Sequence, residues 1–96
     1  MSLYIFARFE PKAGKLQLLH DELLKMVTPA RDEPGCISVH LFEAAKGPPA
    51  FFVHSEWADE ASFEAHCQQP HVVRFGEIAA ELMANPFRAA RTKEIF

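Results

Sequence analysis

The sequence predicts a single α+β domain in which helices cover one face of an antiparallel sheet. Two kinds of observation lead to this prediction. Apolar runs at residues 3–9, 36–43 and 51–57 have the length of strands, and apolar residues at three- and four-residue steps indicate helices between and after them. With 96 residues, the chain is expected to form one domain, residues 1–96, with a modest core.

The first strand and the first helix are predicted in the N-terminal third of the chain. Leu3 to Phe9 is an almost continuous apolar and aromatic run, which is typical of a strand buried on both faces. A helix is expected from about Ala13 to Arg31, because one face of it would carry an apolar stripe. The stripe consists of Leu16, Leu19, Leu23, Met26, Val27 and Ala30. Pro34-Gly35 ends this helical region.

Two further strands are expected to form a hairpin in the middle of the chain. They run from Cys36 to Glu43 and from Phe51 to Trp57. Between them, Lys46-Gly47-Pro48-Pro49 reads as a loop, because proline has no N–H to donate to a sheet.

Two helices and a last strand complete the predicted order. Asp59 is placed to cap a short helix, and Pro70 suits the first position of the next helix, where a missing N–H has no cost. The apolar face of that next helix consists of Val72, Phe75, Ala79 and Leu82. Asn85-Pro86 ends it, and Phe87 to Phe96 is expected to form a fourth strand. The resulting order is that of the split βαβ, or ferredoxin-like, arrangement.

Both faces of the predicted sheet are aromatic. In the third strand, one face carries Phe51, Val53 and Trp57, and the other carries Phe52, His54 and Glu56. One layer of helices covers only one face, so we expect the other face to pack against a second copy in a homodimer. There, Arg8 and Glu56 are expected to pair across neighbouring strands, in preference to a catalytic role for Arg8. His54 is expected to be a hydrogen-bonded interface residue rather than a ligand.

Composition excludes several classes of partner. The net charge of −3 and the absence of a Lys/Arg run argue against nucleic-acid binding. No stretch is apolar enough to span a membrane and the N-terminus lacks the features of a signal peptide, so a cytoplasmic location without membrane association is expected. Cys36 and Cys67 have no CxxC partner and are expected to be reduced, buried side chains.

The motifs of the common cofactor and hydrolase sites are missing. The glycines, at positions 14, 35, 47 and 76, are isolated, so no phosphate-binding loop is present and no flavin or nicotinamide cofactor is expected. There is no GxSxG motif, and Cys67 cannot face His66 as a nucleophile faces its base, because neighbours on a helix diverge by about 100°. No metal is expected either, since His66 and His71 have no carboxylate or thiolate at ligand spacing.

Two histidines and a tryptophan are the candidates for a site. His66 and His71 flank the junction of the last two helices, and His71 is in register with Phe75, which would direct it toward an apolar cavity. A neutral imidazole there can accept a phenolic proton. In the competing interpretation, each histidine caps backbone groups or lies half exposed at a helix start. Trp57 is either a core aromatic residue or a ring that packs on a flat substrate.

A resemblance to a known family rests on two sets of residues. The segment from Phe51 to His71, FFVHSEWADEASFEAHCQQPH, and the upstream residues Lys12, Gly14, Glu33, Pro34, Gly35 and Cys36 resemble the antibiotic biosynthesis monooxygenase family. The resemblance implies a dimeric α/β barrel with a substrate cavity between the sheet and the helices. In this chain, the implied lining is Ile5, Ala7, Val53, Trp57 and Phe75. His71 is then the first candidate for a general base, and His66 is the second.

The implied activity is the oxidation of a quinol or another polyphenol by O₂ without a cofactor. The substrate anion itself would reduce the oxygen, while the protein desolvates the ring and removes a proton. Haem oxygenation is not expected, because haem-degrading relatives carry an Asn where this chain has Ala7. Two alternatives stay open: a module that binds or senses small aromatic molecules without turnover, and an isomerase or cyclase that uses the same base without oxygen.

Overall fold

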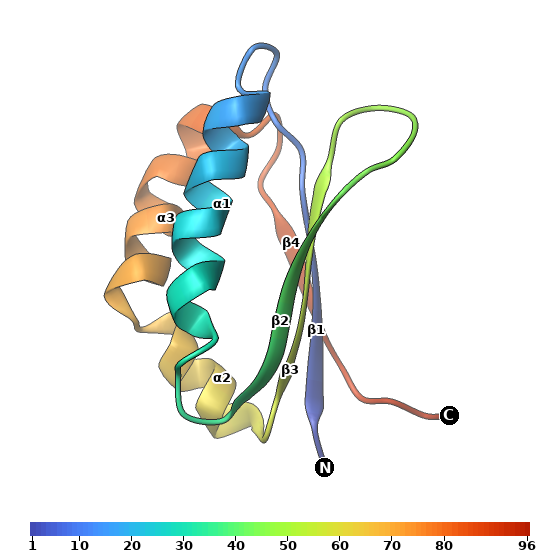
Figure 1. Ribbon diagram of the computed structural model, residues 1–96, viewed down its shortest axis with the longest axis vertical. Helices are drawn as coiled ribbons and strands as arrows, with labels where there is room; N and C mark the ends of the chain where they lie inside the picture. Colours follow the sequence, from blue (N-terminus) through green and yellow to red (C-terminus); the bar gives the residue numbers. More distant parts are fainter.

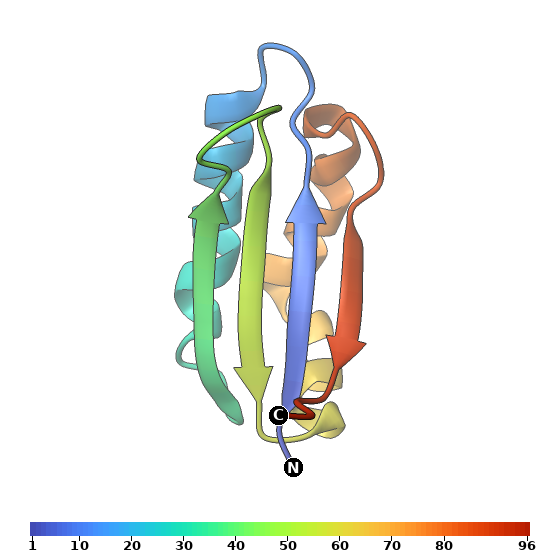
Figure 2. The same ribbon diagram turned by 90° about the vertical axis from the view of Figure 1, so that its right-hand side faces the viewer.

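The computed structural model describes residues 1–96 and confirms the predicted α+β, ferredoxin-like fold: a four-stranded antiparallel sheet with three helices on one face (Figure 1). The elements in chain order are β1 (Leu3–Phe9), α1 (Leu16–Ala30), β2 (Cys36–Glu43), β3 (Phe51–Trp57), α2 (Glu60–Cys67), α3 (Pro70–Leu82) and β4 (Arg88–Thr92). The strand order across the sheet is β2-β3-β1-β4, which places β3 and β1 at the centre (Figure 2).

The register of β1 and β3 sets which side chains enter the core. Ala7 lies opposite Val53 and Phe9 lies opposite Phe51, with all four side chains on the helical side of the sheet. Since side chains alternate along a strand, the intervening residues point to the other face. The core between the sheet and the two long helices is centred on buried residues that include Leu19, Leu23, Val27, Phe75 and Ala79. None of the three helices has the length and apolar character needed to cross a membrane.

The helix boundaries follow the predicted signals, with one difference. The predicted start of α1 at Ala13 is too early, because Gly14 adopts a φ of +78° in a turn and the helix begins at Leu16. Asp59 caps α2 as predicted, accepting a hydrogen bond of 2.8 Å from the backbone N–H of Ser62. This bond and a second from the Ser62 hydroxyl hold the pKa of Asp59 below its usual value. Pro70 is the first residue of α3, also as predicted.

The last strand is shorter than the predicted segment of residues 87–96. β4 pairs only with β1, and its last residue, Thr92, lies opposite Tyr4, which is the second residue of β1. The register would place Lys93 opposite Leu3, where β1 begins, so the residues after Lys93 have no strand to pair with.

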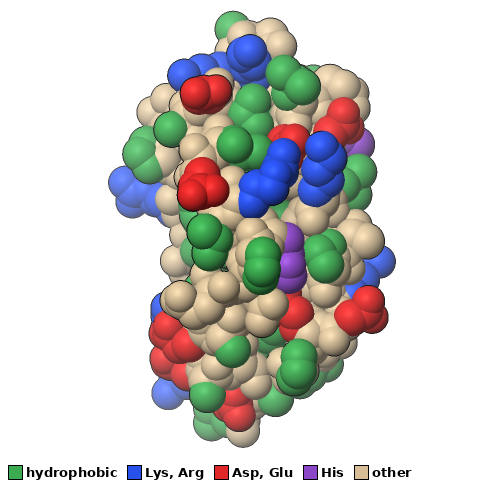
Figure 3. Space-filling model, turned by 90° about the vertical axis from the view of Figure 1, so that its left-hand side faces the viewer, with side chains coloured by type: hydrophobic (Ala, Val, Ile, Leu, Met, Phe, Trp, Pro, Cys, Tyr) green, Lys and Arg blue, Asp and Glu red, His purple; other side chains and the backbone are tan.

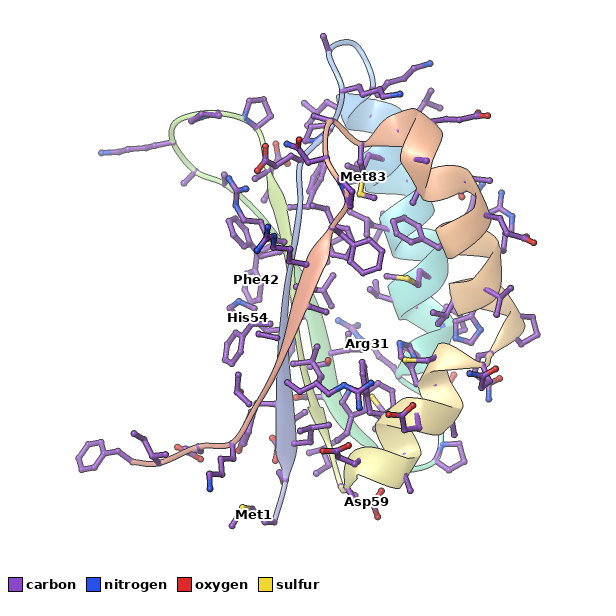
Figure 4. The ribbon with its side chains drawn as sticks, turned by 180° about the vertical axis from the view of Figure 1, so that it is seen from behind. Met1, Arg31, Phe42, His54, Asp59 and Met83 are labelled. Atoms are coloured by element: carbon purple, nitrogen blue, oxygen red, sulfur yellow. The ribbon has the colours of Figure 1, made fainter.

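The face of the sheet away from the helices carries exposed aromatic side chains. Phe6 and Phe42 are 45% and 47% exposed, although both are large apolar residues. The ring of His54 contacts both, with centroid distances of 4.7 Å to Phe6 and 5.0 Å to Phe42. Figure 4 labels His54 and Phe42 on this face. His54 therefore makes ring contacts within the chain and no side-chain hydrogen bond. In a single chain, β1 is buried on one face only.

The predicted pair between Arg8 and Glu56 is wrong. In the antiparallel register Arg8 lies opposite Phe52, whereas Glu56 lies opposite Tyr4, toward the other end of β1. Arg8 instead forms an ion pair with Glu10 and lies over the ring of Phe52, 5.8 Å from its centroid. The two side chains do lie on the same face of neighbouring strands, as predicted, but they are too far apart along the strands to pair.

Candidate functional site

Glu33, His66 and His71 meet in one partly buried cluster. The Nδ1 atom of His66 lies 3.0 Å from both carboxylate oxygens of Glu33. The Nε2 atom of His71 lies 2.6 Å from Oε2 of the same carboxylate. The side chains of Glu33, His66 and His71 are 9%, 12% and 20% exposed, so the carboxylate is the most buried member. We call these three residues the Glu-His-His cluster.

Glu33 is held in place by the turn between α1 and β2. The backbone N–H of Cys36 donates to the carbonyl of Glu33 at 3.1 Å, which closes the turn. Gly35 supplies the left-handed conformation that the turn needs, with a φ of +82°. The carbonyl of Gly35 also accepts from the backbone N–H of Ala58 at 2.8 Å, which fixes the turn beside the end of β3.

The two histidines are brought to Glu33 by the junction of α2 and α3. His66 lies in the last turn of α2, and His71 follows Pro70 in the first turn of α3. The N–H groups of Gln68 and Gln69 donate to carbonyls of α2, so the chain turns directly from one helix into the next. The imidazole rings lie 6.2 Å apart between centroids.

The hydrogen bonds assign a tautomer to each imidazole. A carboxylate only accepts hydrogen bonds, so His66 donates through Nδ1–H and His71 donates through Nε2–H. A neutral His66 then carries a lone pair on Nε2. This atom has no hydrogen-bond partner, and no fully buried side-chain nitrogen or oxygen in the structure lacks one, so Nε2 is not completely buried. His66 can therefore accept a proton at Nε2 while its Nδ1–H stays hydrogen-bonded to the Glu33 carboxylate.

An apolar cavity of about 360 Å³ lies between the sheet and the helices, and His66 is part of its wall. Four of the five residues expected to line a cavity do so: Ile5, Ala7, Val53 and Phe75. Further apolar lining comes from residues such as Phe9, Met26, Phe63, Val72 and Phe87. The polar exceptions are Ser55, His66 and Cys67. Burial raises the pKa of the Cys67 thiol, which therefore stays protonated at neutral pH.

Trp57 and His71 lie outside this wall. Trp57 is 1% exposed, and its Nε1–H donates to the Ser55 hydroxyl at 3.0 Å. Its ring packs on the ring of His66 with centroids 4.6 Å apart, so it supports the histidine from the core. His71 contacts Glu33 and is the most exposed member of the Glu-His-His cluster. Figure 3 shows the helical side of the molecule, where histidine atoms reach the surface among apolar and charged side chains.

Sequence reasoning missed the role of Glu33. The sequence predicted no carboxylate near the two histidines. This prediction is wrong, because the Glu33 carboxylate lies within hydrogen-bond distance of both in the folded chain. Spacing along the sequence could not reveal this, since Glu33 comes from a turn before β2. The available signal was the position of Glu33 next to Pro34-Gly35, within the residues that carry the family resemblance.

Comparison of the sequence with known proteins gives the same family. The family model described as antibiotic biosynthesis monooxygenase matches residues 2–78. An uncharacterized protein of Synechocystis, sll1783, is 33% identical over 60 residues, which are 62% of this chain but only 41% of that protein. A Mycobacterium tuberculosis protein named "Putative monooxygenase Rv0793" is 29% identical over 82 residues, covering 85% of this chain and 80% of that protein.

Solved structures agree closely with this fold. The structure of Rv0793 superimposes with a TM-score of 0.93 over 100% of this chain and 97% of that chain, at 25% identity. The crystal structure of PA3566 from Pseudomonas aeruginosa gives a TM-score of 0.92 over 99% of this chain and 95% of that chain, also at 25% identity. With a family model that matches most of its length, the chain belongs to the antibiotic biosynthesis monooxygenase family.

Proposed function

We propose that this protein is a monooxygenase that oxidises a quinol or another polyphenolic aromatic molecule with O₂, without a cofactor. The observation that carries the proposal is the position of His66, which lines an apolar cavity of about 360 Å³ and whose Nε2 has no hydrogen-bond partner. Membership of the antibiotic biosynthesis monooxygenase family supports oxygenation as the reaction class. The cavity volume falls within the range of small-molecule sites.

In the proposed reaction, His66 is the general base. Its Nε2 takes a phenolic proton from the substrate, which turns the neutral quinol into a phenolate that is a stronger reductant. The imidazolium that forms keeps its Nδ1–H bond to Glu33, and the negative carboxylate stabilises the new positive charge. His71 is a positioning residue, because its 2.6 Å hydrogen bond to Oε2 of Glu33 helps to hold the carboxylate in place.

This assignment changes the order of the two candidates. His71 was expected to be the first candidate for the base, because it shares a helix face with Phe75. The cavity wall contains His66 and not His71. A base must come within hydrogen-bond distance of the proton that it removes, so we assign the role to His66.

The apolar wall supports the oxygen step. A phenolate held away from water can reduce O₂ directly, and the two oxygen atoms then have different fates. One atom is inserted into the ring, and the other leaves as water after taking up two hydrogens from the substrate. One quinol and one O₂ thus give one hydroxyquinone and one water, so no external reductant is needed.

Oxygen uptake tests the proposal. Chelator-treated, flavin-free protein is mixed with a panel of reduced naphthoquinols and anthrones, and O₂ consumption above autoxidation is recorded for wild type and for His66→Ala. We expect uptake by the wild type with at least one substrate and a loss of about 10²-fold or more in the variant. Binding of the panel without any uptake would instead favour a binding module, and turnover under nitrogen would favour an isomerase.

We also propose that the open face of the sheet pairs with the same face of a second copy. Phe6 and Phe42 are nearly half exposed there, and they flank His54 at the centre of the face. Apolar rings that are exposed side by side on an otherwise soluble protein favour an interface. A two-fold pairing of identical faces would bury both sets of rings.

A further inference from the structure

We infer that Glu33, His66 and His71 also form a binding site for one divalent first-row transition-metal ion. One carboxylate oxygen and one nitrogen from each imidazole lie within 4.8 Å of one another. The proposal rests on this geometry and does not depend on the proposed oxygenation.

The distances suit a single ion. Metal bonds to imidazole nitrogen and carboxylate oxygen are about 2.1 Å long, so ligand atoms around one ion lie about 3 to 3.5 Å apart. The two histidine–glutamate distances, 3.0 Å and 2.6 Å, are already close to that range. The two nitrogens lie within 4.8 Å of each other, and small rotations of the imidazole rings can bring all three distances into that range.

The chemistry of the three side chains points to a transition metal. Two imidazoles and one carboxylate are a ligand set used for Zn²⁺, Fe²⁺ and similar ions, whereas Ca²⁺ and Mg²⁺ prefer oxygen ligands alone. Three protein ligands leave at least one position for water. The greater exposure of His71 gives the ion and that water a route to solvent.

The three ligands are supported by different elements. Glu33 lies in the turn closed by Gly35, His66 lies at the end of α2, and His71 lies at the start of α3. A bound ion would join these elements, which the hydrogen bonds of Glu33 already hold together. The site is thus largely formed before the ion arrives, which lowers the ordering cost of binding.

Metal binding has a consequence for His66. The ion would replace the proton on Nδ1, and a neutral imidazole that is bound through Nδ1 carries its proton on Nε2. Nε2 is the nitrogen that the proposed oxygenation needs without a proton. This consequence rests on the proposed function: the metal-bound protein should be inactive, and removal of the ion by a chelator should restore activity.

Titration with Co²⁺ tests the site itself. Chelator-treated protein is titrated at neutral pH, and the visible absorption of protein-bound Co²⁺ is followed, with Zn²⁺ then added as a competitor. We expect one ion per chain, release of protons on binding, and a rise in the thermal midpoint with Zn²⁺ concentration. Affinity should fall at least about tenfold in Glu33→Gln and in His71→Ala, since each lacks one ligand.

His20→Ala is the matched control. His20 also lies 3.0 Å from a carboxylate, that of Asp21, but this pair has no third ligand. Its removal should leave stoichiometry and affinity unchanged. The site is refuted by the absence of Co²⁺ binding to wild type, by equal affinity in the cluster variants, or by loss of binding in the control. Since no substrate is present, these results do not depend on whether the protein is an oxygenase.

Discussion

The Nδ1 atom of His66 lies 3.0 Å from the carboxylate of Glu33, although the two residues are 33 positions apart in the chain. This contact fixes the tautomer of His66, which lines the apolar cavity, and leaves Nε2 without a hydrogen-bond partner. It also joins the turn before β2 to the end of α2. The proposed base and the proposed metal site both depend on it.

Replacing Glu33 by Gln should reduce oxygenation without unfolding the protein. The amide keeps a hydrogen-bond acceptor, but it has no charge to stabilise the imidazolium of His66. We expect kcat for O₂ uptake to fall by about tenfold or more, with a smaller change in KM. Glu22→Gln is the control, because Glu22 is similarly buried but pairs with Arg74 and Lys25 away from the cavity. Equal activities for the two variants would argue against the role of Glu33.

Gly35→Ala should destabilise the protein more than Gly14→Ala. Both glycines have positive φ values, +82° and +78°, so alanine at either position costs about 1 to 2 kcal/mol. At position 14 a new Cβ meets nothing within 4 Å, whereas at position 35 it would lie 2.5 Å from Cβ of Ser62 and still closer to its hydroxyl. Urea unfolding should therefore show an additional loss of at least about 1 kcal/mol for Gly35→Ala. Equal losses would mean that the turn can move away from α2.

Trp57→Phe should affect stability more than substrate binding. The substitution removes the indole N–H that donates to the buried Ser55 hydroxyl, and it shrinks a side chain that is 1% exposed. We expect a loss of about 1 to 3 kcal/mol in the free energy of unfolding, with KM close to that of wild type. A double-mutant cycle with Ser55→Ala isolates the hydrogen bond, and the two losses should not add. A large rise in KM with unchanged stability would instead place the ring against the substrate.

Phe42→Glu should dissociate the proposed dimer. A charge at this exposed aromatic position would be buried in the proposed interface, where desolvation opposes pairing. Sedimentation at micromolar concentration should show a dimer for wild type and a monomer for the variant. Leu18→Glu, at a 51% exposed position on the helical side, should remain dimeric. A monomeric wild-type protein would contradict the proposed pairing.

The elements could be predicted because their signals are local. The signals used were the spacing of apolar residues, the capping residue Asp59 and the position of Pro70 at a helix start. Each depends only on neighbouring residues, and the cap and the helix start are present in the structure. The predictions were wrong where a contact depended on residues that are distant in the chain. Arg8 and Glu56 share a face and neighbouring strands, but the register of the whole ladder separates them. In the same way, no local pattern relates Glu33 to two histidines on later helices.

Chemical rescue of His66→Ala tests the proposed base most directly. Removal of the ring should leave space next to the cavity, while Glu33 and His71 keep their contact. We predict that added imidazole restores O₂ uptake to His66→Ala in a concentration-dependent way, and that it has no such effect on His71→Ala. Full activity of His66→Ala without imidazole would contradict the assignment of His66 as the base.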